Sequence, residues 1–180
     1  MPDAGAIADA ARLIAGARRP LIVVGGGALD AANAVSGFAE LVQAPVYSYR
    51  MGRGVLDARH PLAIMLPAAH RYWKDCDVVI GIGTRLQMPV QQWGTDAGMK
   101  FVRIDVDEAQ LELIRAADVG IAGRAADVLP RLADEVERIG GGRAPGRQAG
   151  AVVGVLGHRR GHRAVGDVDE AVGEREQRVR

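Results

Sequence analysis

The stretch "LIVVGGGALDAA", from Leu21 to Ala32, decides how the rest of the chain is interpreted. Four apolar residues run into three glycines, and a helix-forming segment follows, which is the pattern of a buried strand, a tight turn and a helix. Glycines in such a turn either let the chain pass closely from strand to helix or let a phosphate approach the helix N-terminus. The sequence leaves both uses open at this point.

Strand-like and helix-like segments alternate on both sides of this stretch. We expect strands at 21–24, 45–49, 77–83, 100–107 and 118–123. We expect helices at 4–16, 28–43, 108–116 and 124–139, and a further helix that either starts late, near Pro67, or is kinked there. Continuous apolar strands separated by helices are typical of a parallel sheet covered on both faces. The sequence therefore predicts one α/β domain over residues 1–139, a three-layer, Rossmann-like parallel sheet.

Residues 140–180 differ in composition from the rest of the chain. They contain no Phe, Trp or Tyr and a single Leu, and Gly, Arg and Val make up most of the segment. Such a segment cannot bury enough apolar surface to offset the entropy lost on ordering, so we expect a disordered, low-complexity tail. Two origins stay open: a flexible basic extension, or DNA translated out of frame after a frameshift near Gly140.

Composition excludes several classes of function. The formal net charge of +1 gives no field that would attract nucleic acid or an anionic membrane. No apolar run approaches the roughly 20 residues that span a bilayer, and no secretory signal is visible, so we expect a cytoplasmic protein. Cys76 is the one cysteine, which excludes an internal disulfide.

The glycine turn matches only half of the dinucleotide-binding pattern G-x-G-x-x-G. Gly25 and Gly27 fit the first two positions, but the third falls on Asp30, and the acidic residue expected about 20 positions later is missing. Arg50, after the second strand, would suit a 2′-phosphate, and the loop "RMGRG" that it opens is basic enough to face a phosphate. Three interpretations stay open: a tight turn only, an anion or nucleotide at the helix N-terminus, and an NAD(P) site.

Five segments occur in one order along the chain: "RRPLIVVGGGA", "LVQAPVYSYRMGRGVLDARHPL", "DVVIGIGTRL", "FVRIDVDEAQL" and "DVGIAGRAADVLPRLADEV". This order resembles the central domain of thiamine-diphosphate-dependent enzymes, the group that includes acetolactate synthase, benzoylformate decarboxylase and pyruvate oxidase. The resemblance covers about residues 10–137 and implies a sheet of the DHS-like NAD/FAD-binding type.

The resemblance also implies where the chemistry lies. In that family the first domain supplies the catalytic glutamate, and the third holds thiamine diphosphate through a magnesium motif that needs a pair of asparagines. Asn33 is the one asparagine of this chain. We therefore expect a non-catalytic domain whose full-length form binds thiamine diphosphate and Mg²⁺, acts on a 2-oxo acid, and works with other domains or subunits in a homo-oligomer.

Carried over position by position, the family's nucleotide crevice falls on seven cofactor-binding candidates: Gly25, Gly26, Gly27, Gly83, Thr84, Arg85 and Asp105. Some family members bind FAD there. Two departures weaken FAD binding for this chain: Leu86, Gln87 and Met88 replace acidic residues after Arg85, and Arg124 replaces the aspartate of a Gly-Asp-Ala sequence. FAD stays open on this basis, and the alternative to a family fragment is a stand-alone NADP- or FAD-binding Rossmann domain.

Overall fold

A computed structural model describes residues 1–142 of the chain. The predictions made for the tail fall, from residue 143 onward, outside the described residues.

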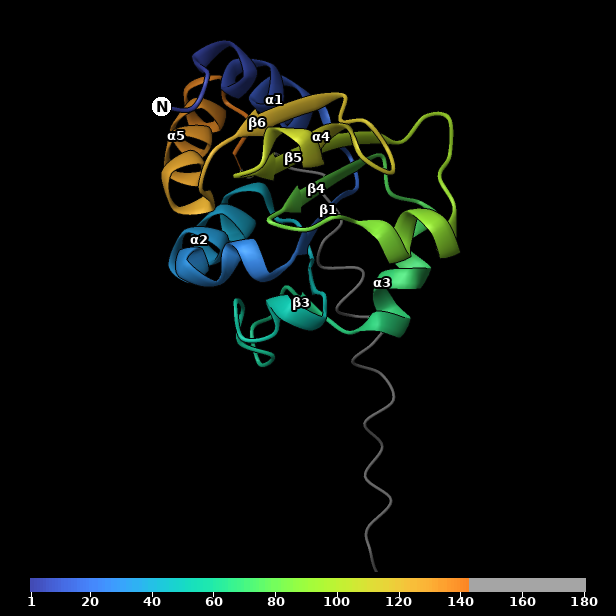
Figure 1. Ribbon diagram of the computed structural model, residues 1–180. Coiled ribbons are helices and arrows are strands. Elements are labelled where there is room, and N and C mark those ends of the chain that lie inside the picture. Colours follow the sequence, from blue (N-terminus) through green and yellow to red (C-terminus); the bar gives the residue numbers. More distant parts are fainter. Residues whose placement is uncertain (143–180) are drawn as a thin grey trace, which may run out of the picture.

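Six parallel strands form a single sheet at the centre of the domain (Figure 1). They are β1 (Pro20–Val24), β2 (Val46–Ser48), β3 (Ala63–Ile64), β4 (Val78–Ile82), β5 (Lys100–Asp105) and β6 (Val119–Ala122). The spatial order is β3-β2-β1-β4-β5-β6, so the chain starts in the middle and builds outward in both directions. Five of these strands are expected from the sequence; the sixth, β3, has only two residues and too short a pattern to be predicted.

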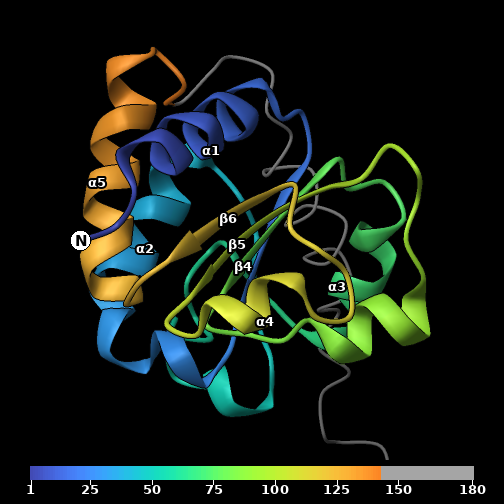
Figure 2. The same cartoon turned by 45° about the horizontal axis from the view of Figure 1, so that its top comes forward.

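Helices cover both faces of the sheet (Figure 2). The helices α1 (Ala4–Gly16), α2 (Ala32–Val42) and α5 (Ala125–Arg138) lie on one face, and the shorter α3 (Leu66–Trp73) and α4 (Glu108–Glu112) lie on the other. Three short elements complete the described part: the 3₁₀ helices η1 (Gly26–Ala31) and η2 (Arg50–Gly52), and the π-helical turn η3 (Pro89–Trp93). The predicted three-layer α/β architecture is confirmed.

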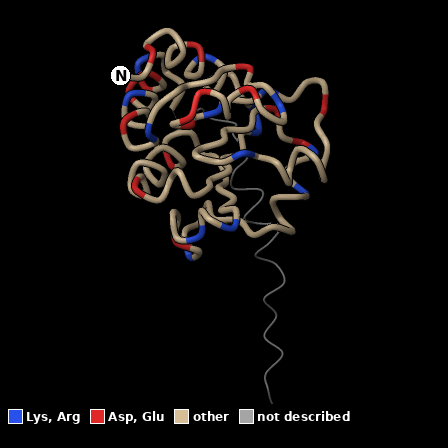
Figure 3. The backbone as a smooth tube through the Cα atoms, in the orientation of Figure 1, with Lys and Arg blue, Asp and Glu red and all other residues tan. Residues whose placement is uncertain are grey.

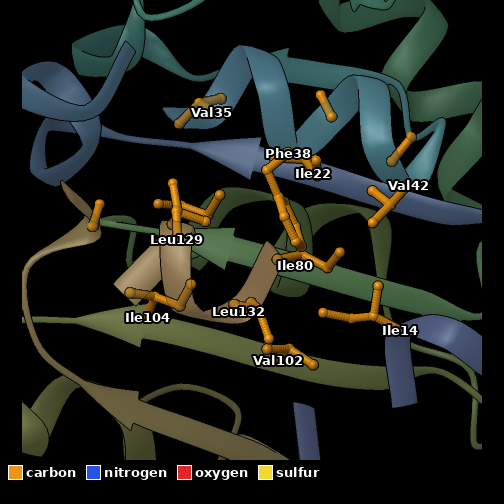
Figure 4. Packing of buried hydrophobic residues seen from close by; sticks show 14 of the residues in the cluster. Ile14, Ile22, Val35, Phe38, Val42, Ile80, Val102, Ile104, Leu129 and Leu132 are labelled. Carbon is orange, nitrogen blue, oxygen red and sulfur yellow. The ribbon is translucent and has the colours of Figure 1, made fainter. Parts of the chain in front are cut away.

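The two central strands, β1 and β4, are apolar throughout because both of their faces are buried. Ile22 and Val24 of β1 belong to the core beneath α1, α2 and α5, whereas Leu21 and Val23 belong to the core beneath α3. Phe38 of α2 fills the centre of the first core, surrounded by aliphatic side chains from strands and helices (Figure 4). The second core holds most of the aromatic residues, including Tyr47, Tyr72, Trp73 and Phe101.

Two helices differ from the prediction. The helix expected from Ala28 begins as the 3₁₀ turn η1 and becomes α-helical only at Ala32. The helix expected to reach Ala116 ends at Glu112, because Leu113 is extended and Ile114 has a φ of 69°.

Acidic and basic residues are interspersed along the described chain (Figure 3). No helix within residues 1–142 has the length and apolar character needed to cross a bilayer.

Candidate ligand-binding cleft

The glycine turn after β1 lies where the strand order reverses, between β1 and β4. In open parallel sheets this is the place where ligands bind. Here the turn faces another part of the chain: the Gly25 N–H donates to the Ile82 carbonyl at 3.0 Å, and the Gly27 N–H donates to the Gly83 carbonyl at 3.1 Å. The Ala28 N–H donates back to the Gly25 carbonyl at 3.2 Å. These three N–H groups are therefore used within the protein and do not form a phosphate cradle.

Glycine is required here because two backbones touch. A Cβ atom on Gly25 would lie 2.3 Å from the Gly83 carbonyl oxygen, and a Cβ on Gly83 would lie 2.4 Å from the Gly27 Cα. Gly83 also has a φ of 56°, which favours glycine. The turn at Leu21–Ala32 is thus a close backbone contact between the end of β1 and the end of β4.

A cleft of about 1200 Å³ opens beside this contact, at the carboxyl ends of the strands. Its walls are the glycine turn, the segment 46–58 with the start of α3, and the segment 83–92. Six of the seven predicted site residues line it: Gly25, Gly26, Gly27, Gly83, Thr84 and Arg85. Asp105 is not among the lining residues; its carboxylate accepts the Asp107 N–H at 3.1 Å. A cleft of this size is large enough for a cofactor-sized ligand.

Aromatic rings form one wall of the cleft. Tyr47 and Tyr49 line it with ring centroids 6.3 Å apart in an edge-on arrangement, and Trp93 packs against Tyr47 with centroids 5.8 Å apart and ring planes tilted by 39°. Burial raises the pKa of Tyr47, and Tyr49 adds to that effect, so the phenol is neutral near pH 7. Such a wall suits a planar ligand.

Three arginines give the cleft a positive charge. Arg50, Arg53 and Arg85 are exposed, line the cleft, and form no ion pair within residues 1–142. The one carboxylate in the lining, Asp57, is bridged by Arg59, which holds the pKa of Asp57 well below its usual range. The described cleft therefore favours an anion held by guanidinium groups.

Sequence reasoning finds part of this wall. The loop that begins at Arg50 is predicted as a segment that could face a phosphate, but Tyr47, Tyr49 and the segment 63–66 are not singled out by any motif. The available signal is position: β2 lies directly beside β1, so the residues that end both strands meet at one edge of the sheet.

The two positions that depart from the nucleotide-binding patterns lie together in space. Arg124, at the start of α5, donates to the carboxylate of Asp30 in η1 at 2.5 Å, and neither residue lines the cleft. The Arg124 hydrogen bond lowers the pKa of Asp30. Asp30, at the position of the third glycine, and Arg124, at the position of the aspartate, thus form an ion pair with each other.

The described residues do not fit a magnesium site. Within residues 1–142 no three His, Cys, Asp or Glu side chains are grouped so that they could hold a metal ion. We assign no metal-dependent step to this part of the chain.

The sheet order and the cleft at the reversal point define the class: a Rossmann-like α/β domain with a ligand-sized cleft at the carboxyl edge of its sheet. Residues 7–132 match the family model described as thiamine pyrophosphate enzyme, central domain, and the chain belongs to this family. The resemblance stated from the sequence is confirmed.

Similar proteins agree with this membership. The "Probable acetolactate synthase large subunit" of Methanocaldococcus jannaschii is 36% identical over 138 residues, which cover 70% of this chain and 23% of that protein. The glyoxylate carboligase of Escherichia coli O157:H7 is 34% identical over 150 residues, which cover 74% of this chain and 25% of that protein. The chain thus spans about a quarter of the length of the curated relatives it matches.

A solved structure shares the fold. It is described as a thiamin diphosphate-dependent enzyme from Mycobacterium smegmatis and aligns with a TM-score of 0.65 at 22% identity, over 75% of this chain and 28% of that one.

Proposed function

We propose that this chain supplies the non-catalytic central domain of a thiamine-diphosphate-dependent enzyme that decarboxylates or joins 2-oxo acids, as an acetolactate synthase does. The observation that carries the proposal is the family match over residues 7–132, together with relatives named acetolactate synthase and glyoxylate carboligase. Thiamine diphosphate and Mg²⁺ would be held by parts of the enzyme outside this domain, and none of the catalytic groups is assigned to residues 1–142.

The role we infer for the domain is support. Its sheet is buried on both faces, and residues 1–139 act as one domain onto which other domains or subunits of the enzyme pack. The working enzyme is then a cytoplasmic homo-oligomer.

The test is to identify the neighbouring genes and to assay this chain with and without their products. The DNA on both sides of the coding region is sequenced, and the chain is assayed with pyruvate, thiamine diphosphate and Mg²⁺, alone and together with whatever the neighbouring frames encode. We expect consumption of pyruvate only in the combined sample. Decarboxylation by the purified 180-residue chain alone would contradict the proposal.

A second candidate function is binding of FAD or a related nucleotide in the cleft. The tyrosine wall and the three cleft arginines support it, since a flavin nucleotide is both planar and anionic. The absence of Asp105 from the lining counts against one of the seven cofactor contacts that the family resemblance implies. Where FAD binds, Arg50, Arg53 and Arg85 would hold its phosphates and Tyr49 would lie beside a ring.

This candidate is tested by spectroscopy. A flavin band at about 450 nm in the purified protein, or saturable binding of added FAD, would support it. Arg50→Gln should weaken binding about tenfold, whereas the matched control Arg131→Gln, an exposed arginine on α5 outside the cleft, should not. Tight binding of NADPH instead would favour the stand-alone oxidoreductase and contradict the supporting role.

A further inference from the structure

A buried arginine on β5 donates hydrogen bonds to two separate segments of the chain, 111–115 and 84–86. Arg103 is 2% exposed and forms no ion pair within the described residues. Its Nη1 donates to one carbonyl in α4 and two just after it: Leu111 at 3.3 Å, Leu113 at 2.9 Å and Arg115 at 3.2 Å. Its Nη2 donates to the Thr84 carbonyl, on the cleft, at 3.4 Å.

The neighbouring strands leave room for this arrangement. Arg103 is in register with Gly81 of β4 on one side and Gly120 of β6 on the other. A Cβ on Gly81 would lie 2.9 Å from Leu86 Cδ1, and a Cβ on Gly120 would lie 3.0 Å from Leu111 Cδ1. Leu86 and Leu111 of α4 therefore each lie over a glycine beside the arginine, and the two segments meet around Arg103.

Both segments hold a strained residue within two positions of a carbonyl that Arg103 binds. Leu86, two residues after Thr84, has a φ of 54°, and Ile114, between Leu113 and Arg115, has a φ of 69°. A left-handed conformation is unfavourable for residues with a Cβ, above all for a β-branched one, and persists where surrounding contacts impose it. The hydrogen bonds of Arg103 are contacts of that kind.

We propose that Arg103 is a positioning residue for the cleft: it fixes the segment 84–86, which carries Arg85 on the cleft wall, by tying it to the segment 111–115 on the far side of β5. The inference rests on the proposed binding function only in one respect, namely which ligand Arg85 contacts. The coupling of the two segments stands on the hydrogen bonds themselves.

Amide hydrogen exchange of the full chain tests the coupling without any ligand. In Arg103→Met we expect exchange to be at least about tenfold faster at Val90 and Ala117, whose amides donate to the Leu86 and Leu111 carbonyls, and unchanged at Val46 in β2. A merely structural role would raise exchange across the sheet, including β2, and that result, like unchanged exchange at Val90, would overturn the proposal.

Arg103→Lys distinguishes the hydrogen bonds of Nη1 from that of Nη2. It also replaces Arg103→Met in the exchange experiment if Arg103→Met fails to fold. Its single nitrogen can replace Nη1 but not also Nη2, so Ala117 should stay protected while Val90 exchanges faster. Arg115→Gln is the control, because the Arg115 side chain donates to Ala116 and Asp118 and not to the cleft segment. Equal loss of protection at both sites in Arg103→Lys would contradict the assignment.

Titration with FAD provides the functional readout. If the wild type binds FAD, Arg103→Lys should weaken binding at least about threefold while Arg115→Gln does not, and unchanged affinity in Arg103→Lys would show that the arginine does not position the site. If the wild type binds no FAD, the second candidate function fails, and the exchange experiment alone decides the role of Arg103.

Discussion

At the residue scale, the contact between Gly25 and Gly83 shows why the opening glycines are there. Alanine at position 83 would bring a Cβ within 2.4 Å of backbone atoms and would have to adopt a φ of 56°. Since neither backbone can move without breaking the β1–β4 ladder, we expect Gly83→Ala to lower the free energy of unfolding by about 2–3 kcal/mol. Urea denaturation followed by circular dichroism measures this change.

The matched control is a glycine with open space around it. Gly37 lies inside α2, and apart from the helix's own backbone no atom lies within 4 Å of the position that a Cβ on this residue would take. Gly37→Ala should therefore stabilise the protein by about 0.5–1 kcal/mol, because alanine loses less backbone entropy in a helix. If Gly37→Ala lowers the free energy of unfolding, or if Gly83→Ala leaves it unchanged, the room available for a Cβ does not decide the effect of the substitution.

Cys76 gives a second prediction at this scale. The thiol is buried and donates to the Val78 carbonyl, and burial, with a smaller contribution from Asp77, raises its pKa. The thiolate is the reactive form, so at neutral pH the folded protein should react with a thiol reagent at least about a hundredfold more slowly than the urea-unfolded chain. Comparable rates in the two states would mean that the core beneath α3 opens readily.

At the element scale, Asp118 joins the edge strand β6 to β5. Its carboxylate accepts from Lys100 Nζ at 3.0 Å and from the Phe101 N–H at 2.9 Å. Burial raises the pKa of Asp118, but the bonds from Lys100 and Phe101, with Arg115 nearby, outweigh it, so the pKa is lowered in the folded state. The stability this adds is present above the ordinary aspartate pKa of about 3.9 and is lost as pH falls through the lower folded value.

Asp118→Asn should therefore cost about 1–2 kcal/mol at neutral pH and flatten the loss of stability below about pH 4. Urea midpoints measured from about pH 7 down to about pH 2 test both effects. Asp134→Asn, which removes an exposed carboxylate on α5, is the control and should leave the midpoint at neutral pH nearly unchanged. An acid limb as steep in Asp118→Asn as in the wild type would contradict the prediction.

Sequence patterns predict the elements best where local signals act alone. The helix expected at 4–16 is α1, and the one expected at 124–139 is α5 to within a residue at each end. The prediction of a helix that reaches Ala116 is wrong. The carbonyls of Leu111, Leu113 and Arg115 accept hydrogen bonds from Arg103 on the preceding strand β5. A hydrogen bond of that kind has no local signal in the chain.

The candidate site is predictable to the extent that it follows from topology. The carboxyl ends of β1 and β4 are expected to meet, and they do, but the glycine turn could equally have faced a phosphate. Only the three-dimensional structure shows that Gly83, far along the chain, occupies the space beside Gly27. For the same reason Asp105, a candidate by motif, lies apart from the cleft that Tyr49 and Arg53 help to form.

At the scale of the whole molecule, the two faces of the sheet carry different side chains. Trp73 and Trp93 both belong to the face beneath α3, where their rings are 5.5 Å apart and the Trp73 Nε1–H donates to the Gly94 carbonyl at 2.7 Å. Tryptophan fluorescence therefore reports this face, whereas far-ultraviolet circular dichroism is dominated by α1, α2 and α5 on the other face.

Because each strand sends alternate side chains into the two cores, neither face can lose its packing without exposing the sheet that the other face needs. We expect thermal unfolding curves from fluorescence and from circular dichroism to coincide, as for a single cooperative unit. Leu129→Ala, a cavity beneath α5 on the face without tryptophans, should lower both midpoints equally, at a cost of about 2–4 kcal/mol. A fluorescence transition that stays at the wild-type temperature in this variant would show that the two faces unfold independently.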